Sequence, residues 1–126
     1  MKTTEFVKAK KHEFHQEPCH GGKGAWHFKD YIDSVNKENA IIQFIHDDIL
    51  PAGSAFGVHD HRISENQLFE EWYICLSGHG TMTLDGKPHP FSEGDVTVCR
   101  GGGSHGLENT GDTDMRVIVI KAWTKK

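Results

Sequence analysis

The chain has 126 residues, with 14 basic and 18 acidic side chains and a formal net charge of −4 at pH 7. This length fits one domain with one hydrophobic core, and no basic stripe indicates binding to nucleic acid or to an anionic membrane. No apolar run is long enough to cross a membrane, and residues 1–14 contain no apolar segment typical of a secretion signal. The three cysteines are odd in number and widely spaced, which argues against a disulfide framework, so we expect a cytoplasmic protein.

The first part of the chain differs in composition from the rest. Residues 1–23 are polar and charged, and they predict an N-terminal arm or an edge strand rather than a core element. Glycines follow, and we expect the main domain over residues 24–126. The histidines in and next to the arm fit no compact ligand set, and we expect them at the solvated surface: His12, His15, His20 and His27.

The main domain reads as a series of short strands. Apolar, β-branched or alternating runs separated by glycine-rich turns predict strands. These runs cover residues 25–32, 40–50, 71–76, 81–84, 95–99 and 115–123. Asp85-Gly86 is a strong hairpin signal, and His79 and His89 are expected in exposed turns. Many short strands and no convincing helix predict an all-β sandwich or barrel.

Two histidines and an acid form the first candidate site. His59 and His61 share one face of a strand, because side chains alternate along it. Glu71 opens the next predicted strand, and Tyr73 and Cys75 should share its face. Imidazole and carboxylate together suit a divalent transition metal, although a His-x-His pair on a strand is also common as plain polar surface.

The spacing of these residues resembles the first signature motif of the cupin superfamily, G(x)5HxH(x)3-4E(x)6G. Gly53, His59 and His61 match its first half, and Glu71 and Gly78 match its second half.

The second cupin motif, G(x)5PxG(x)2H(x)3N, is matched by Gly94, Gly102, His105 and Asn109. The resemblance covers roughly residues 26–123. It implies an antiparallel jelly-roll β-barrel, also called a double-stranded β-helix. It also implies one divalent metal, either Mn, Fe, Ni, Co or Zn, with four ligands: His59, His61, Glu71 and His105.

The sequence departs from the motifs at two places. Nine residues separate His61 from Glu71, so Glu65 satisfies the front spacing and Glu71 the back spacing. We choose Glu71, because it starts a strand, and interpret Arg62–Phe69 as an insert that either arches over the barrel mouth or packs on its rim. Arg100 replaces the usual proline, and it is either a surface residue or a cation at the pocket mouth.

The resemblance leaves the reaction open, because cupins host many chemistries. We expect an enzyme of the lyase, isomerase or oxygenase type that acts on a small carboxylate, keto-acid or sugar. Glu65 or Tyr73 would move the proton. The alternative is a non-catalytic protein that binds such a molecule in the same pocket. We also expect a homodimer, as is common in small cupins, with Phe6 and Val7 among the contacts.

Overall fold

A computed structural model of the chain describes residues 3–61 and 68–124. Within these ranges the chain forms ten strands and one short 3-10 helix. In chain order they are β1 (Glu13–His15), η1 (Cys19–Gly21), β2 (Trp26–Asp30), β3 (Ile42–Leu50), β4 (Ala55–Asp60), β5 (Leu68–Ser77), β6 (His79–Leu84), β7 (Lys87–Ser92), β8 (Val96–Arg100), β9 (Ser104–Glu108) and β10 (Met115–Thr124). No helix in the described part of the chain is long and apolar enough to cross a membrane.

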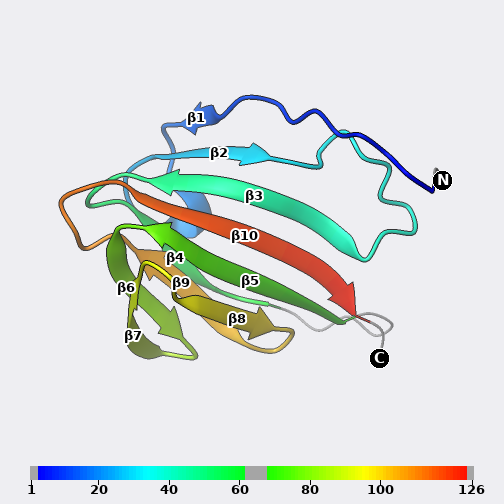
Figure 1. The fold of residues 1–126 in the computed structure, drawn as a ribbon. Coiled ribbons are helices and arrows are strands. Elements are labelled where there is room, and N and C mark those ends of the chain that lie inside the picture. Colours follow the sequence, from blue (N-terminus) through cyan, green and yellow to red (C-terminus); the bar gives the residue numbers. More distant parts are fainter. Residues whose placement is uncertain (1–2, 62–67, 125–126) are drawn as a thin grey trace.

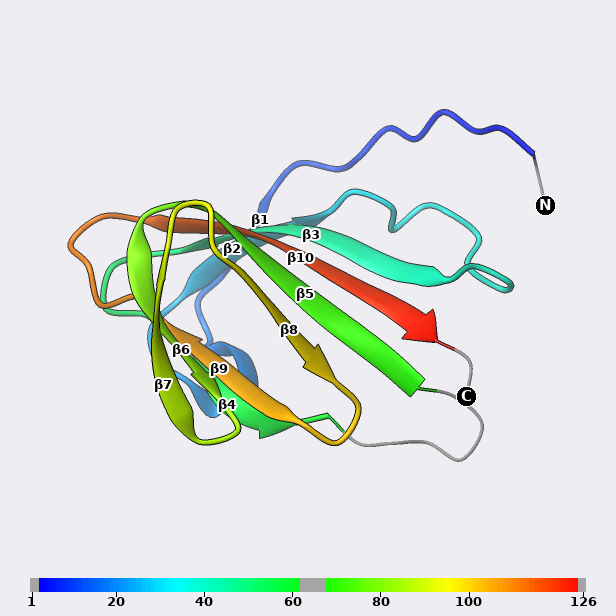
Figure 2. The same cartoon turned by 60° about the horizontal axis from the view of Figure 1, so that its bottom comes forward.

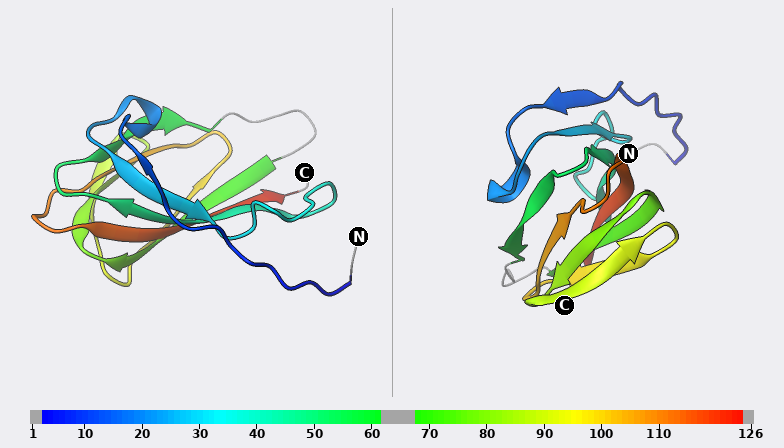
Figure 3. Two further views of the ribbon diagram at one scale, coloured as in Figure 1. Left: turned by 90° about the horizontal axis from the view of Figure 1, so that it is seen from above. Right: turned by 90° about the vertical axis from the view of Figure 1, so that its left-hand side faces the viewer.

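The strands form two antiparallel sheets. The larger sheet has six strands in the order β1-β2-β3-β10-β5-β8, and the smaller has four in the order β4-β9-β6-β7 (Figure 1). Figures 2 and 3 show the two sheets as two layers seen from different sides. Successive strands cross repeatedly between the sheets, so that neighbours such as β3 and β10 come from distant parts of the chain. This is a jelly roll, and the all-β fold predicted from the sequence is confirmed.

Alternation along the long strands builds the core. In β10, Met115, Val117 and Val119 are buried inside the barrel, whereas Arg116 between them is exposed. In β5, Tyr73 and Cys75 are buried on the same face as Glu71, as the sequence predicted. The buried core cluster draws on both sheets and comprises Leu50, Phe56, Tyr73, Cys75, Met82, Phe91, Leu107, Met115, Val117 and Val119.

The sequence did not predict β7. Its stretch KPHPFS contains Pro88 and Pro90, which lack the N–H that a central strand needs. In the structure β7 lies at the edge of the smaller sheet, where a missing donor is tolerated. His89 therefore lies in β7 and His79 begins β6, so the prediction that they lie in turns was wrong, although both are exposed.

An ion pair fastens the outer face of the larger sheet. The carboxylate of Asp47 in β3 is fully buried and accepts hydrogen bonds from Arg116 Nε at 2.9 Å and from the Tyr31 hydroxyl at 3.2 Å. His12 Nε2 of the N-terminal segment lies 3.4 Å from the same carboxylate. Arg116 holds the pKa of Asp47 below its usual value. The pair therefore ties β3 to β10, and His12 adds a contact from the segment ahead of β1.

Replacing Asp47 by Asn should lower the free energy of unfolding by about 1–3 kcal/mol, the usual range for a hydrogen bond to a charged group. Because the folded pKa of Asp47 is depressed, the carboxylate stabilises the fold above about pH 3.8, its unfolded value. This contribution is lost as the pH falls through the folded pKa. Urea unfolding between about pH 7 and pH 2 should show the difference between variant and wild type shrinking toward zero. A difference that stays constant over this range would contradict the assignment.

Candidate metal centre

Two of the four candidate ligands come from the end of β4. Val58 and Asp60 are exposed, whereas His59 and His61 turn toward the barrel interior. The backbone of His61 pairs with the loop ahead of β9, since its N–H donates to Gly103 O at 2.8 Å and its carbonyl accepts from Gly102 N–H. These two hydrogen bonds fix the glycine loop, residues 101–103, against the strand that carries the histidines.

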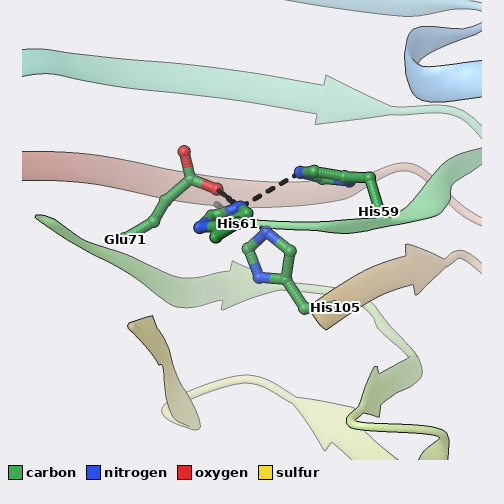
Figure 4. A group of neighbouring side chains, drawn as sticks. All are labelled: His59, His61, Glu71 and His105. Carbon is green, nitrogen blue, oxygen red and sulfur yellow. Dashed lines mark hydrogen bonds and ion pairs between the residues drawn. The ribbon is translucent and has the colours of Figure 1, made fainter. Parts of the chain in front are cut away.

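The other two candidates come one from each sheet. His105 in β9 pairs across the smaller sheet with His59, and Glu71 lies in β5 of the larger sheet. All four side chains point to one place (Figure 4), where one ligand atom from each lies within 4.8 Å of the others. His61 Nε2 lies 3.1 Å from His59 Nε2 and 3.5 Å from Glu71 Oε1, while His105 Nε2 lies 2.9 Å from that oxygen.

The surroundings of His61 and Glu71 favour the protonation states that metal binding requires. Burial lowers the pKa of His61 to about 4, against the opposing pull of Glu71. Burial alone would raise the pKa of Glu71, but the histidines, with His105 first, outweigh it, so the net direction is down. His59 Nδ1 lies 3.0 Å from Gly57 O, which fits an Nδ1–H donor and leaves Nε2 with a lone pair. A neutral His61 imidazole and an ionised Glu71 carboxylate are thus the favoured forms.

Unsatisfied nitrogens support a metal at this place. His105 is almost fully buried, yet neither of its ring nitrogens makes a hydrogen bond, and His61 Nδ1 lacks a partner as well. His105 Nε2 is close to Glu71 but without hydrogen-bond geometry. Buried polar groups normally have a partner. Three imidazole nitrogens and one carboxylate oxygen form a donor set that suits Mn, Fe, Co, Ni or Zn.

Three members of the cluster, His59, His61 and Glu71, line a cavity of about 460 Å³. Aromatic side chains line much of this cavity, including Trp26, Phe44 and Phe56. Lys121 of β10 also lines it, with Nζ 4.5 Å from the ring centroid of Phe69 and 5.4 Å from that of Trp123. A cation beside the four-residue cluster favours an anionic ligand. Lys121 was not predicted as a cavity residue, because it follows the apolar run of β10 and belongs to no motif.

Of the two residues expected to transfer a proton, the structure describes Tyr73 but not Glu65. Tyr73 lines the cavity, and its ring lies edge-on to His105 with centroids 5.2 Å apart. Burial raises the pKa of Tyr73 well above its usual value, so the phenol stays protonated. Glu65 lies outside the described residues, as does most of the Arg62–Phe69 insert. The described end of the insert, Phe69, does line the cavity and lies 4.9 Å from the His61 ring.

The structure refines the expectation for the arm histidines. His20 is exposed, as predicted, but its ring also stacks on His59 with centroids 3.7 Å apart and lines the cavity. His15 is instead half-buried and stacks on Trp26. Spacing could not reveal the position of His20 beside the cluster, because it reaches the site from another part of the chain. His46 also lines the cavity and stacks on Phe44.

Arg100 and the buried cysteines have no part in the cluster. Arg100 is exposed, with Nε 3.5 Å from Glu70 Oε2, and it does not line the cavity. The surface alternative for this residue is therefore the one the structure supports. Cys75 and Cys99 are buried, and burial raises the pKa of both thiols. Buried thiols with raised pKa values are poor nucleophiles, so neither cysteine is placed to react.

Comparison with known proteins identifies a family and two relatives that resemble this chain. Residues 48–121 match the Cupin_2 family, described as the cupin domain. The chain is 42% identical over 71 residues to an oxalate-binding protein of Thermotoga maritima, covering 56% of this chain and 54% of that protein. It is 30% identical over 83 residues to an uncharacterized protein of Methanocaldococcus jannaschii, covering 66% of this chain and 62% of that protein. These matches thus span less than two thirds of either relative.

A solved structure extends the similarity to most of the chain. The crystal structure of a predicted oxalate decarboxylase from Thermotoga maritima superposes with a TM-score of 0.79 and 28% sequence identity. The superposition covers 95% of this chain and 100% of that one. It therefore includes the N-terminal segment that the family match leaves out.

Proposed function

The chain belongs to the cupin domain family, and on this premise we propose that it binds one divalent transition metal through His59, His61, Glu71 and His105 and holds a small carboxylic acid beside it. The convergence of these four side chains, at a cavity that Lys121 also lines, is the observation that carries the proposal.

Different residues of the cavity would attract the ligand and exclude water from it. A bound divalent metal supplies Lewis acidity toward a carboxylate or carbonyl oxygen. Lys121 lies opposite Glu71 in the β10–β5 register, so its ammonium group is placed to attract a negatively charged ligand. Phe69 and Trp123 hold this ammonium group by cation–π contacts. Phe44 and Phe56 would exclude water from the ligand.

The names of two similar proteins support a carboxylate as the ligand class. One is an oxalate-binding protein and the other a predicted oxalate decarboxylase. Both names refer to a small dicarboxylate, which agrees with the presence of Lys121 in the cavity lining. We therefore place a carboxylic acid ahead of a neutral sugar among the ligands expected from the sequence.

Catalytic turnover is a second proposal, and Tyr73 is the residue that favours it. Its phenol is buried in the cavity, and its raised pKa keeps the proton in place near neutral pH. Such a group can donate a proton to a ligand but cannot act as a base. The alternative is a protein that binds the acid without changing it. Incubating the metal-loaded protein with oxalate and measuring formate distinguishes binding from decarboxylation.

Metal content tests the ligand assignment. Purified protein dialysed against Mn or Zn should retain about one ion per chain, because the site offers one converged donor set. His61→Ala and Glu71→Gln should each lower metal affinity by at least about tenfold, as measured by elemental analysis and titration. Glu65→Gln is the matched control and should leave affinity unchanged. Loss of metal in Glu65→Gln but not in Glu71→Gln would show that the insert was placed on the wrong side of the motif glutamate.

Oxalate binding tests the role of Lys121. Lys121→Met removes the charge but keeps much of the side-chain length. It should therefore weaken oxalate binding by about tenfold or more in calorimetry, equivalent to about 1.4 kcal/mol. Metal content should not change. The control is Lys87→Met, which removes an exposed lysine of β7. Equal oxalate affinity in wild type and Lys121→Met would contradict the proposed anchor.

We further propose that the protein is a homodimer. Two features support it. The short strand β1 forms the edge of the larger sheet, where unpaired backbone groups invite pairing with another chain. Phe6 and Phe14 in the same segment are exposed. Light scattering at micromolar concentration should give twice the chain mass. A monomer mass would rule this proposal out without affecting the metal site.

A further inference from the structure

The inner face of the larger sheet carries three cross-strand rows of side chains over β3, β10 and β5. They are Phe44–Lys121–Glu71, then His46–Val119–Tyr73, then Asp48–Val117–Cys75. Side chains on one face recur every second residue, so neighbouring rows are about 7 Å apart. The first row contains the proposed metal ligand and the proposed anion anchor. The polar residues of the other two rows on β3 therefore lie farther along the same face.

His46 and Asp48 have no assigned role, yet both line the cavity. Asp48 is only 3% exposed, and its Oδ1 makes no hydrogen bond among the described residues. His46 Nδ1 lies 3.8 Å from that oxygen, which is too far for a hydrogen bond. A buried carboxyl oxygen without a partner, in the wall of a cavity, is a group available to a ligand.

The surroundings of both side chains favour their uncharged forms. Burial raises the pKa of Asp48 well above its usual value, and Asp47, Glu71 and Asp30 act in the same direction. Burial likewise lowers the pKa of His46, although Asp30 opposes it. In these forms the carboxyl group can both donate and accept hydrogen bonds, and so can the imidazole.

The charges behind this pair disfavour a second anion. Asp30 Oδ2 lies 4.0 Å from His46 Nε2, and the nearby Lys37 is already paired with Asp30 at 3.6 Å. A carboxylate placed against His46 and Asp48 would therefore approach an existing negative charge. A hydroxyl or carbonyl group would instead find a donor and an acceptor.

We propose that His46 and Asp48 form a second subsite, which hydrogen-bonds the hydroxyl groups of a ligand whose carboxylate is held near Lys121 and the metal. The ligand class is a hydroxylated monocarboxylic acid of the size of a sugar acid. The cavity volume of about 460 Å³ is in the usual range for drug-sized ligands and exceeds what oxalate fills. Trp26 lines the same cavity and offers a flat apolar surface to the carbon chain. This inference rests on the proposed function above.

Three acids of equal chain length test the subsite on the Mn-loaded wild-type protein: gluconate, 2-hydroxyhexanoate and 2-hydroxyadipate. All three chelate a metal through the same α-hydroxy acid group, so any difference in affinity comes from the distal end. Calorimetry should show gluconate binding at least tenfold more tightly than either of the others. Equal affinities, or tighter binding of 2-hydroxyadipate, would overturn the subsite.

Substitution of Asp48 tests whether this residue causes the preference for gluconate. Asp48→Leu should abolish the preference for gluconate, whereas Asp48→Asn should keep it, because an amide also donates and accepts hydrogen bonds. Asp112→Asn is the control, since Asp112 is exposed in the loop between β9 and β10 and does not line the cavity. An unchanged preference in Asp48→Leu, or its loss in Asp48→Asn, would contradict the role given to Asp48. The wild-type comparison decides the matter if Asp48→Leu does not fold.

Binding of Mn and oxalate distinguishes failure of the subsite from failure of the proposed function. If the wild-type protein binds Mn and oxalate but does not prefer gluconate, the subsite is wrong and the proposed function stands. If it binds neither Mn nor any of the acids, the proposed function fails and the subsite with it.

Discussion

Side chains of a β-strand alternate between two faces, and in this barrel that constraint decides which polar groups meet the cavity. Asp47 and Asp48 are adjacent in β3, but they belong to different environments. Asp47 is bound by Arg116 on the outer face and stays ionised, with its pKa lowered. Asp48 faces the cavity, and burial raises its pKa. The same rule turns His59 and His61 inward while Val58 and Asp60 remain exposed.

Backbone pairing turns this local rule into a three-dimensional site. The candidate ligands come from β4 with the residue after it, from β5 and from β9, and these segments belong to both sheets. His61 is pinned through its backbone to Gly102 and Gly103, just ahead of His105. The geometry of the cluster is thus set by main-chain hydrogen bonds of the barrel, and not by contacts among the imidazoles themselves.

The parts of the site that follow local spacing could be predicted from the sequence. The resemblance of two spacings to the cupin motifs was enough to select four residues that the structure brings together, three from the first motif and His105 from the second. The strand β7 was missed because Pro88 and Pro90 hide an edge strand. His20, Lys121 and Asp48 were not identified as cavity residues because their place depends on which strands pair, and no local pattern encodes that. Asp48 in particular looks identical to its neighbour in the sequence.

The contact between the N-terminal segment and β4 has a consequence for how this barrel can diversify. Gly22 and Gly57 face each other so closely that a Cβ at Gly22 would lie 1.9 Å from Ala55 O, and one at Gly57 would lie 1.9 Å from His20 O. The segment that carries His20 therefore forms part of the cavity wall without belonging to either sheet. Changes in this segment alter the shape of the cavity, and through the stacking of His20 on His59 they also reach one of the four converged side chains. Variation in the N-terminal segment therefore couples the shape of the cavity to the setting of a candidate metal ligand, provided that the paired glycines are kept.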